Sequence, residues 1–158
     1  MTEETQYYLA YGSNLSMAQM AQRCPDAYYV GTAWLENYQL LFRGNQRGYY
    51  LTAEPKAGSR IPLLVWKISS QDEKYLDEYE DYPELYEKKR ISVSLRSLLD
   101  GSSAGEIEGL IYTMYPSFSL GCPTASYYAT CEEGYKRFGF DLGILSKALA
   151  DSGEGGLG

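Results

Sequence analysis

Hydrophobic residues in the first half of the chain come in short runs that are separated by turn-forming residues. Each run has the length and the aromatic and branched aliphatic content of a β-strand. The segments 44–48 and 55–58 between them contain Gly together with Asn or Pro, which favours turns. Spacing this short predicts a meander or a small barrel. The expected strands cover residues 8–11, 27–34, 38–43, 49–54 and 61–68.

Most of the helical patterns lie from Ser70 onward, after these strands, which predicts a mixed α+β fold. Ser70 and Glu73 have the spacing of a capping box, so a helix is expected to begin at Ser70. It should end near Glu80, because Pro83 disfavours helical geometry at Tyr82. The other expected elements are strands at 90–95 and 108–114, a turn-rich loop at 100–105, and helices at 124–138 and 142–149.

The length of 158 residues predicts one domain that is large enough to bury a substantial core. We expect this domain to cover residues 1–151 and the Gly-rich segment 152–158 to be a disordered tail. No apolar run approaches the ~20 residues of a membrane-spanning helix. The acidic start MTEETQ is not a secretory signal.

Charge and cysteine content narrow the expected partners and compartment. The net charge of −7 argues against a nucleic-acid partner. Cys24, Cys122 and Cys131 lack CxxC spacing, so we interpret them as packing thiols in a reducing compartment. The expectation is a cytoplasmic protein with neither nucleic-acid nor membrane partners.

The absence of histidine restricts the chemistry more than any other feature of the composition. It removes every Ser-His-Asp or Cys-His device and every histidine-ligated metal site. Acid–base work must then fall to carboxylates, Tyr, Lys or Cys, and no metal or cofactor is expected. The 17 tyrosines make an aromatic pocket with hydroxyl groups easy to build.

One candidate site is the turn Gly12-Ser13-Asn14, which follows the strand that ends at Tyr11. Ser16 can cap a helix over 17–23. A strand, a Gly-containing turn and a helix start place several backbone N–H groups in one concavity, which suits carboxylates, phosphates or oxyanions. The alternative is a plain strand-to-helix connection in which Gly supplies the bend.

A second candidate is one carboxylate among the eight acidic residues between positions 72 and 87. Most acidic runs are solvated faces. Helical spacing, however, puts Glu80 directly over Leu76, the strongest core anchor, while Asp77, Glu78 and Asp81 should point elsewhere. Desolvation there would raise the pKa of Glu80, as a general base near neutral pH requires. The alternative is a Glu at a helix end that bends to solvent or pairs with an Arg.

The two candidates together resemble the gamma-glutamyl cyclotransferase-like family, which carries a Tyr-Gly-Ser-Asn loop and, much later, one catalytic Glu. The matching stretches here are YLAYGSNL and LDEYEDYPELY. MAQRCPDAYYVGTAWLENYQLLFR and PTASYYATCEEGY are also similar, so the resemblance spans about residues 7–135.

The resemblance implies a small, mostly antiparallel β-barrel or curved mixed sheet with packed helices. It assigns acid–base catalysis to Glu80. Asp81 departs from the family pattern, in which a Gly often follows the Glu, and Pro62-Leu63 departs where a strand often carries a Gly. The residues that it places around the gamma-glutamyl end of the substrate are Tyr11, Gly12, Ser13, Asn14 and Leu15. It matches Tyr86 and Tyr127 to tyrosines that close the pocket and orient the substrate, and the alternative for both is ordinary core packing.

The implied reaction converts a gamma-glutamyl amide or amino acid to 5-oxoproline and a free amine. It needs no protein nucleophile, because the α-amine of the substrate attacks its own γ-carbonyl. The expected partner is therefore a small gamma-glutamyl compound, bound by a monomer or homodimer. One alternative is a non-catalytic module that binds a small molecule or peptide end with the loop 11–14. The other, a Cys-based acyl transferase, lacks both His and a suitably placed Cys.

Overall fold

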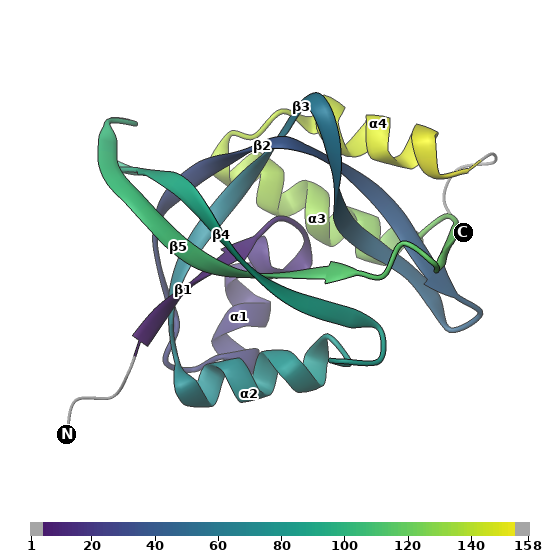
Figure 1. Cartoon of the computed structure of the whole chain (residues 1–158), viewed down its shortest axis with the longest axis horizontal. Helices are drawn as coiled ribbons and strands as arrows, with labels where there is room; N and C mark the ends of the chain where they lie inside the picture. The colour runs from purple at the N-terminus through teal and green to yellow at the C-terminus, as the bar shows by residue number, and fades with distance from the viewer. Residues whose placement is uncertain (1–4, 154–158) are drawn as a thin grey trace.

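The computed structural model of the protein describes residues 5–153, which form a six-stranded mixed sheet and four α-helices (Figure 1). The sheet order is β3-β1-β5-β4-β2-β6. Among the strands of the described residues, β1 and β5 pair in parallel and the other pairings are antiparallel. The strands are β1 (Thr5–Ala10), β2 (Tyr28–Asn45), β3 (Gly48–Ser69), β4 (Tyr86–Arg96), β5 (Ser103–Met114) and β6 (Ser119–Leu120).

An additional pairing between β3 and β2 closes the sheet into a small barrel. β2 and β3 form one long antiparallel hairpin from Tyr28↔Lys67 to Asn45↔Gly48. β2 meets β4 at the pair Thr32↔Arg96, which completes the circuit. The mixed α+β class and the curved, mostly antiparallel sheet are therefore as the sequence predicts.

The long hairpin corrects the prediction of four separate strands between residues 27 and 68. β2 runs for 18 residues and β3 for 22, so the expected turn at 55–58 is part of β3. The register shifts between Glu36 and Tyr38, where Asn37 has φ 63° and accepts a hydrogen bond from the Gly58 backbone N–H at 3.1 Å. A β-bulge at this point bends the hairpin without ending its strands. The bulge uses the residue types that also form turns, so the sequence alone predicts a chain reversal here. β5 likewise begins at Ser103, inside the loop predicted at 100–105.

The helix α2 (Ser70–Tyr79) is capped one residue earlier than the sequence predicts. Ser69 is the N-cap: its Oγ accepts from the Asp72 backbone N–H at 3.1 Å, and the Asp72 carboxylate accepts from the Ser69 N–H at 3.2 Å. Asp72 is fully buried and also accepts from the Asp26 N–H. Asp72, anchored in this way, takes the capping role that the spacing assigned to Glu73.

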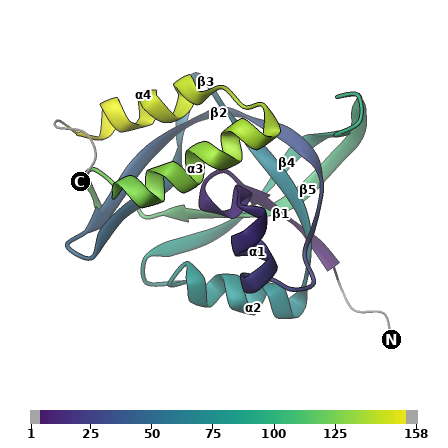
Figure 2. The ribbon, with the colours of Figure 1, turned by 180° about the vertical axis from the view of Figure 1, so that it is seen from behind.

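The other helices are α1 (Met17–Arg23), α3 (Ala125–Phe138) and α4 (Leu142–Ser152). They lie on the side of the barrel that Figure 2 shows, with α3 beside α4 and α1 beside α2. Ser152 was expected in the tail but ends α4, where its buried Oγ accepts from the Phe42 N–H at 2.8 Å. The rest of the predicted tail, from residue 154 on, lies outside the described residues.

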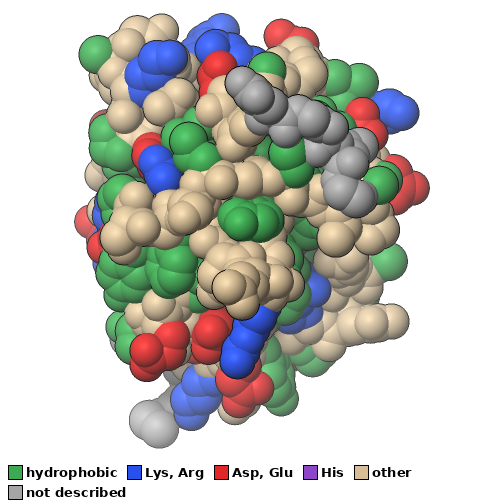
Figure 3. Space-filling view, turned by 90° about the vertical axis from the view of Figure 1, so that its right-hand side faces the viewer, with side chains coloured by type: hydrophobic (Ala, Val, Ile, Leu, Met, Phe, Trp, Pro, Cys, Tyr) green, Lys and Arg blue, Asp and Glu red, His purple; other side chains and the backbone are tan. Residues whose placement is uncertain are grey.

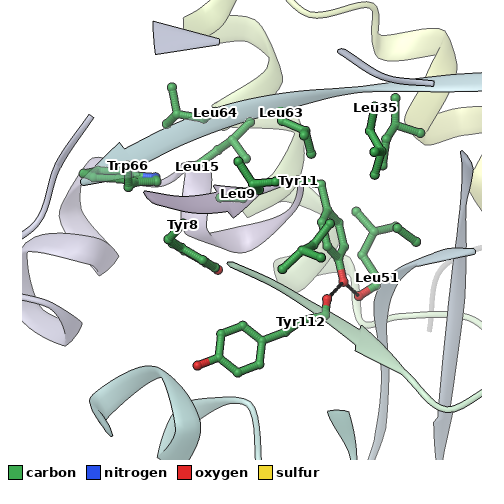
Figure 4. Packing of buried hydrophobic residues seen from close by; sticks show 14 of the residues in the cluster. Tyr8, Leu9, Tyr11, Leu15, Leu35, Leu51, Leu63, Leu64, Trp66 and Tyr112 are labelled. Carbon is green, nitrogen blue, oxygen red and sulfur yellow. Dashed lines mark hydrogen bonds between the residues drawn. The ribbon is translucent and has the colours of Figure 1, made fainter. Parts of the chain in front are cut away.

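The core fills the barrel and the space beneath the helices with tyrosines and branched aliphatic side chains, some of which Figure 4 shows. On the face in Figure 3, the described Lys and Arg side chains are scattered and form no continuous patch. None of the described helices has the length and apolar character needed to cross a membrane.

Candidate active site

A cavity of about 280 Å³ lies where the loop after β1, the end of α2 and the barrel wall meet. Tyrosine is its commonest lining residue, and Glu80 and Asp81 are its acidic ones. The full lining is Tyr8, Tyr11, Gly12, Ser13, Asn14, Asn45, Arg47, Tyr50, Leu51, Tyr79, Glu80, Asp81, Leu85, Tyr86, Tyr112 and Tyr127. The two candidate features of the sequence therefore share one cavity.

The loop after β1 is a tight turn with unused backbone donors. Residues Ser13–Leu15 form a short 3₁₀ helix, closed by the Leu15 N–H on the Gly12 carbonyl at 3.1 Å. The indole N–H of Trp66 donates to the Asn14 carbonyl at 3.1 Å and fixes the loop on the barrel. Among the described residues, no acceptor takes the backbone N–H groups of Gly12, Ser13 or Asn14. They are donors available to an anion in the cavity that these residues line.

Gly12 allows the loop to approach the barrel wall closely. A Cβ at this position would lie 3.3 Å from Leu51 Cδ2 and 3.6 Å from the Tyr127 hydroxyl. A methyl group would make Leu51 move slightly, whereas a larger side chain would fill space beside Tyr127. The need for glycine here comes from this approach and not from its backbone angle of φ −136°.

Three cavity tyrosines direct their hydroxyls at the backbone of the wall. Tyr11 donates to the Tyr112 carbonyl at 2.6 Å, as the dashed lines in Figure 4 show. Tyr86 donates to the Leu51 carbonyl at 2.9 Å, and Tyr127 accepts from the Leu51 N–H at 3.1 Å. These bonds fix the rings that shape the cavity. Because the protons of the Tyr11 and Tyr86 hydroxyls are already used, these hydroxyls can act toward a ligand only as acceptors.

Glu80 follows the last turn of α2, where its N–H donates to the Leu76 carbonyl at 2.8 Å. The residue is half-buried at the cavity, and its carboxylate has no hydrogen bond or ion pair within residues 5–153. Burial raises the pKa of Glu80 to about 8, and the positive charge of Arg23 lowers it in part. An unpaired carboxyl with this pKa can both take and return a proton near neutral pH.

The neighbouring acids differ from the sequence prediction in one case. Glu78 is exposed and Asp77 does not line the cavity, as expected. The Asp77 carboxylate accepts from the Tyr112 hydroxyl at 2.6 Å and pairs with Lys88 at 2.9 Å. Asp81 lines the cavity, because its left-handed backbone (φ 53°) turns the chain away from the helical path that the spacing argument assumes.

Tyr8 is the most informative cavity residue that the sequence argument missed. It is 4% exposed, and its hydroxyl accepts from Asn14 Nδ2 at 2.7 Å. No acceptor for the Tyr8 proton exists among the described residues, so that proton is available to a ligand. Only the alternation along β1, which separates the two sides of a strand, could have indicated that Tyr8 has a different environment from Tyr7.

Comparison with known proteins identifies the family of this chain. Residues 8–132 match the family model described as gamma-glutamyl cyclotransferase, AIG2-like. The chain belongs to this family. No curated protein matches the sequence.

Solved structures share the fold of this gamma-glutamyl cyclotransferase-like chain. An uncharacterized human protein is 27% identical, with a TM-score of 0.77 over 92% of this chain and 87% of its own. A protein named gamma-glutamyl cyclotransferase is 25% identical, with a TM-score of 0.78 over 98% and 94%. A yeast cyclotransferase specific to glutathione is 12% identical, with a TM-score of 0.64 over 96% of both chains, and supports the fold alone.

Of the residues that the family resemblance assigns, all but one line the cavity. Leu15 is the exception, since it is fully buried under the loop and packs against α3 at Gly134. No group of three or more metal-binding side chains exists in the described part of the chain.

Proposed function

We propose that the protein is a gamma-glutamyl cyclotransferase, which converts a gamma-glutamyl amide to 5-oxoproline and a free amine. The observation that carries this proposal is Glu80, an unpaired carboxyl with a pKa of about 8 that shares a cavity with the donors of the loop. A site that bound an anion only would gain nothing from a carboxylate at this place. Family membership supports the same reaction class.

Substrate binding would begin at the loop. The N–H groups of Gly12, Ser13 and Asn14 can hold the α-carboxylate of the glutamyl group or the oxyanion that develops on its γ-carbonyl. The tyrosine rings confine the glutamyl chain, and the Tyr11 and Tyr86 oxygens can accept from its ammonium group. A curled glutamyl chain brings the α-nitrogen to the γ-carbon, and well-oriented intramolecular reactions reach effective molarities of ~10⁵–10⁸ M.

The chemical step needs one proton carrier. Glu80, ionised, takes a proton from the α-ammonium, and the freed nitrogen attacks the γ-carbon to close the five-membered ring. The C–N bond to the leaving group then breaks, and protonated Glu80 returns its proton to the leaving nitrogen. The ring nitrogen still carries one proton more than the lactam product, and this second proton passes to the regenerated carboxylate and from it to the released amine. The proton count then balances, and Glu80 ends the cycle ionised.

The cysteines do not support the alternative of an acyl-cysteine enzyme. None of the three lines the cavity. Burial raises the pKa of both the Cys24 and the Cys131 thiol to about 12, so their reactive thiolate forms are scarce at neutral pH.

A panel of gamma-glutamyl compounds tests the proposed function: a gamma-glutamyl amino acid, a gamma-glutamyl alkylamine, gamma-glutamyl-ε-lysine and glutathione. We expect at least one to yield 5-oxoproline and its amine in equal amounts, at a rate proportional to protein concentration. Binding of panel members without release of either product would instead favour the non-catalytic binding module.

A further inference from the structure

Arg23, at the end of α1, is the charged group that joins the loop to the end of α2, although it does not line the cavity. Its guanidinium donates to Asn14 Oδ1 and stacks on the Tyr79 ring at 3.3 Å from the ring centroid. The Tyr79 hydroxyl in turn lies 3.1 Å from the Ser13 hydroxyl. Arg23 forms no ion pair with any described carboxylate, so its charge is not neutralised by a partner.

The contact with Asn14 determines the direction of a chain of hydrogen bonds. A guanidinium has donors only, so the Asn14 oxygen must face Arg23 and the Asn14 amide nitrogen must face Tyr8. The Tyr8 oxygen therefore accepts, and its proton is left for the cavity. Without Arg23, the Asn14 amide could turn over and take the Tyr8 proton instead.

Arg23 also lies close to the acid–base group, because its guanidinium stacks on the ring of Tyr79, the residue that precedes Glu80. Burial raises the pKa of Glu80, and Arg23 from α1 lowers it in part. Burial also raises the pKa of the tyrosines around Glu80, and the negative charge of Glu80 raises it further; these tyrosines are Tyr8 from β1, Tyr11 after it, Tyr79 from α2, Tyr86 from β4 and Tyr127 from α3. Asp81 follows in the chain and lines the same cavity. Arg23 is the cation whose charge lowers the pKa of Glu80 and favours its ionised form. A second cation, Arg47 from the turn between β2 and β3, lines the same cavity.

We propose that Arg23 is a positioning residue of this site: it holds the Asn14 amide so that Tyr8 presents its hydroxyl proton to the substrate, and its charge keeps Glu80 available as the ionised base. The kinetic part of this proposal rests on the proposed cyclotransferase activity. The electrostatic part can be measured without it.

The test compares Arg23→Gln with Arg23→Lys and with a control, Lys74→Gln, which removes the same charge from an exposed position on α2. Circular dichroism checks that each variant folds. Carboxyl NMR titration of Glu80, assigned with Glu80→Gln, should show its pKa raised by ~0.5 pH unit or more in Arg23→Gln. It should be near the wild-type value in Arg23→Lys and Lys74→Gln. An unchanged titration in folded Arg23→Gln overturns the electrostatic part.

Steady-state release of 5-oxoproline gives the second readout. In Arg23→Gln we expect KM to rise about tenfold, the value of one hydrogen bond, and the acid limb of kcat/KM to move to higher pH. Arg23→Lys should return the acid limb of kcat/KM to its wild-type pH. Its KM should lie between those of Arg23→Gln and wild type, because an ammonium does not stack flat on Tyr79. A wild-type KM in Arg23→Gln overturns the positioning role. If wild type releases no 5-oxoproline, the proposed function fails, whereas the titration still decides the effect of Arg23 on Glu80.

Discussion

The pKa of Glu80 makes the proposed reaction dependent on pH in a defined direction. The base must be ionised to accept the proton of the substrate, and burial holds its pKa near 8. Below that pH, kcat/KM should therefore fall about tenfold for each pH unit, and it should level off above it, because kcat/KM reports the free enzyme. In the pH profile of kcat, the acid limb should lie at a lower pH, since the ammonium group of the bound substrate favours the ionised carboxylate. A pH profile from 5 to 9.5 checks both, and a kcat/KM limb near 4.5 would contradict the burial argument.

Single residues show how far sequence reasoning reaches. The spacing from Leu76 points to Glu80 among eight acids, and Glu80 does line the cavity, but so does Asp81, which the same spacing directs elsewhere. Leu15 and Tyr8 cannot be assigned in this way. Whether a loop residue turns into the core or a strand residue turns toward the cavity depends on contacts with α3 and Asn14 that no local pattern records.

Among the elements, the loop after β1 allows a prediction that depends on how closely Gly12 approaches the barrel wall. Gly12→Ala should be tolerated with a loss of a fewfold in kcat/KM, because Leu51 can move by a few tenths of an ångström. Gly12→Val should raise KM at least tenfold, because its branched side chain occupies the space beside Leu51 and the Tyr127 hydroxyl. Steady-state kinetics on both folded variants provides the check. The loop is not the substrate site if Gly12→Val retains the wild-type KM.

The turn after α2 allows a prediction about the backbone conformation of Asp81. Asp81 has φ 53°, a region in which glycine is unstrained and short polar residues are tolerated. Asp81→Ala should thus be about 1 kcal/mol less stable than Asp81→Gly. Glu84→Ala, at a nearby exposed position, is the control and should change the free energy of unfolding by less than ~0.5 kcal/mol. Urea unfolding of the three variants measures these differences, and equal stability of the two Asp81 variants would show that the turn imposes no strain.

The same turn gives a physical reason for the Gly that the family resemblance implies at position 81. The sequence places Asp81 where the family often has Gly, and the left-handed φ supplies the physical reason for that preference. The elements themselves could largely be predicted, because strand and helix periodicities are local. The continuity of β2 and β3 could not, since a bulge and a turn use the same residue types.

For the whole molecule, we predict activity that does not depend on a metal. The sequence has no histidine, and the proposed step needs only the carboxyl of Glu80 to move protons. After prolonged dialysis against EDTA and a zinc-selective chelator, the enzyme should keep at least ~80% of the turnover of a mock-dialysed sample. Loss of activity on chelation with recovery on adding zinc or magnesium would argue against a mechanism with one carboxylate.

The barrel is the part of the whole molecule that periodicity alone predicts least. Short strands with turns between them fit a meander as well as a barrel. Closure depends on the pairing of β2 with β3 along their length and on Thr32↔Arg96, which are contacts between distant segments. The family resemblance favoured the barrel for this reason, because it draws on relatives in which such contacts already exist.

The most direct test of the account is the rate of 5-oxoproline release by Glu80→Gln. The amide keeps the length and shape of the side chain but cannot accept the proton, and general acid–base groups contribute ~10²–10⁴-fold, so turnover should fall by at least 10²-fold. Substrate affinity and the circular dichroism spectrum should stay close to wild type, since the loop and the tyrosines are unchanged. Glu78→Gln, on the exposed side of α2, is the matched control and should keep full turnover. A folded Glu80→Gln protein with near wild-type turnover would contradict the central role of this carboxylate.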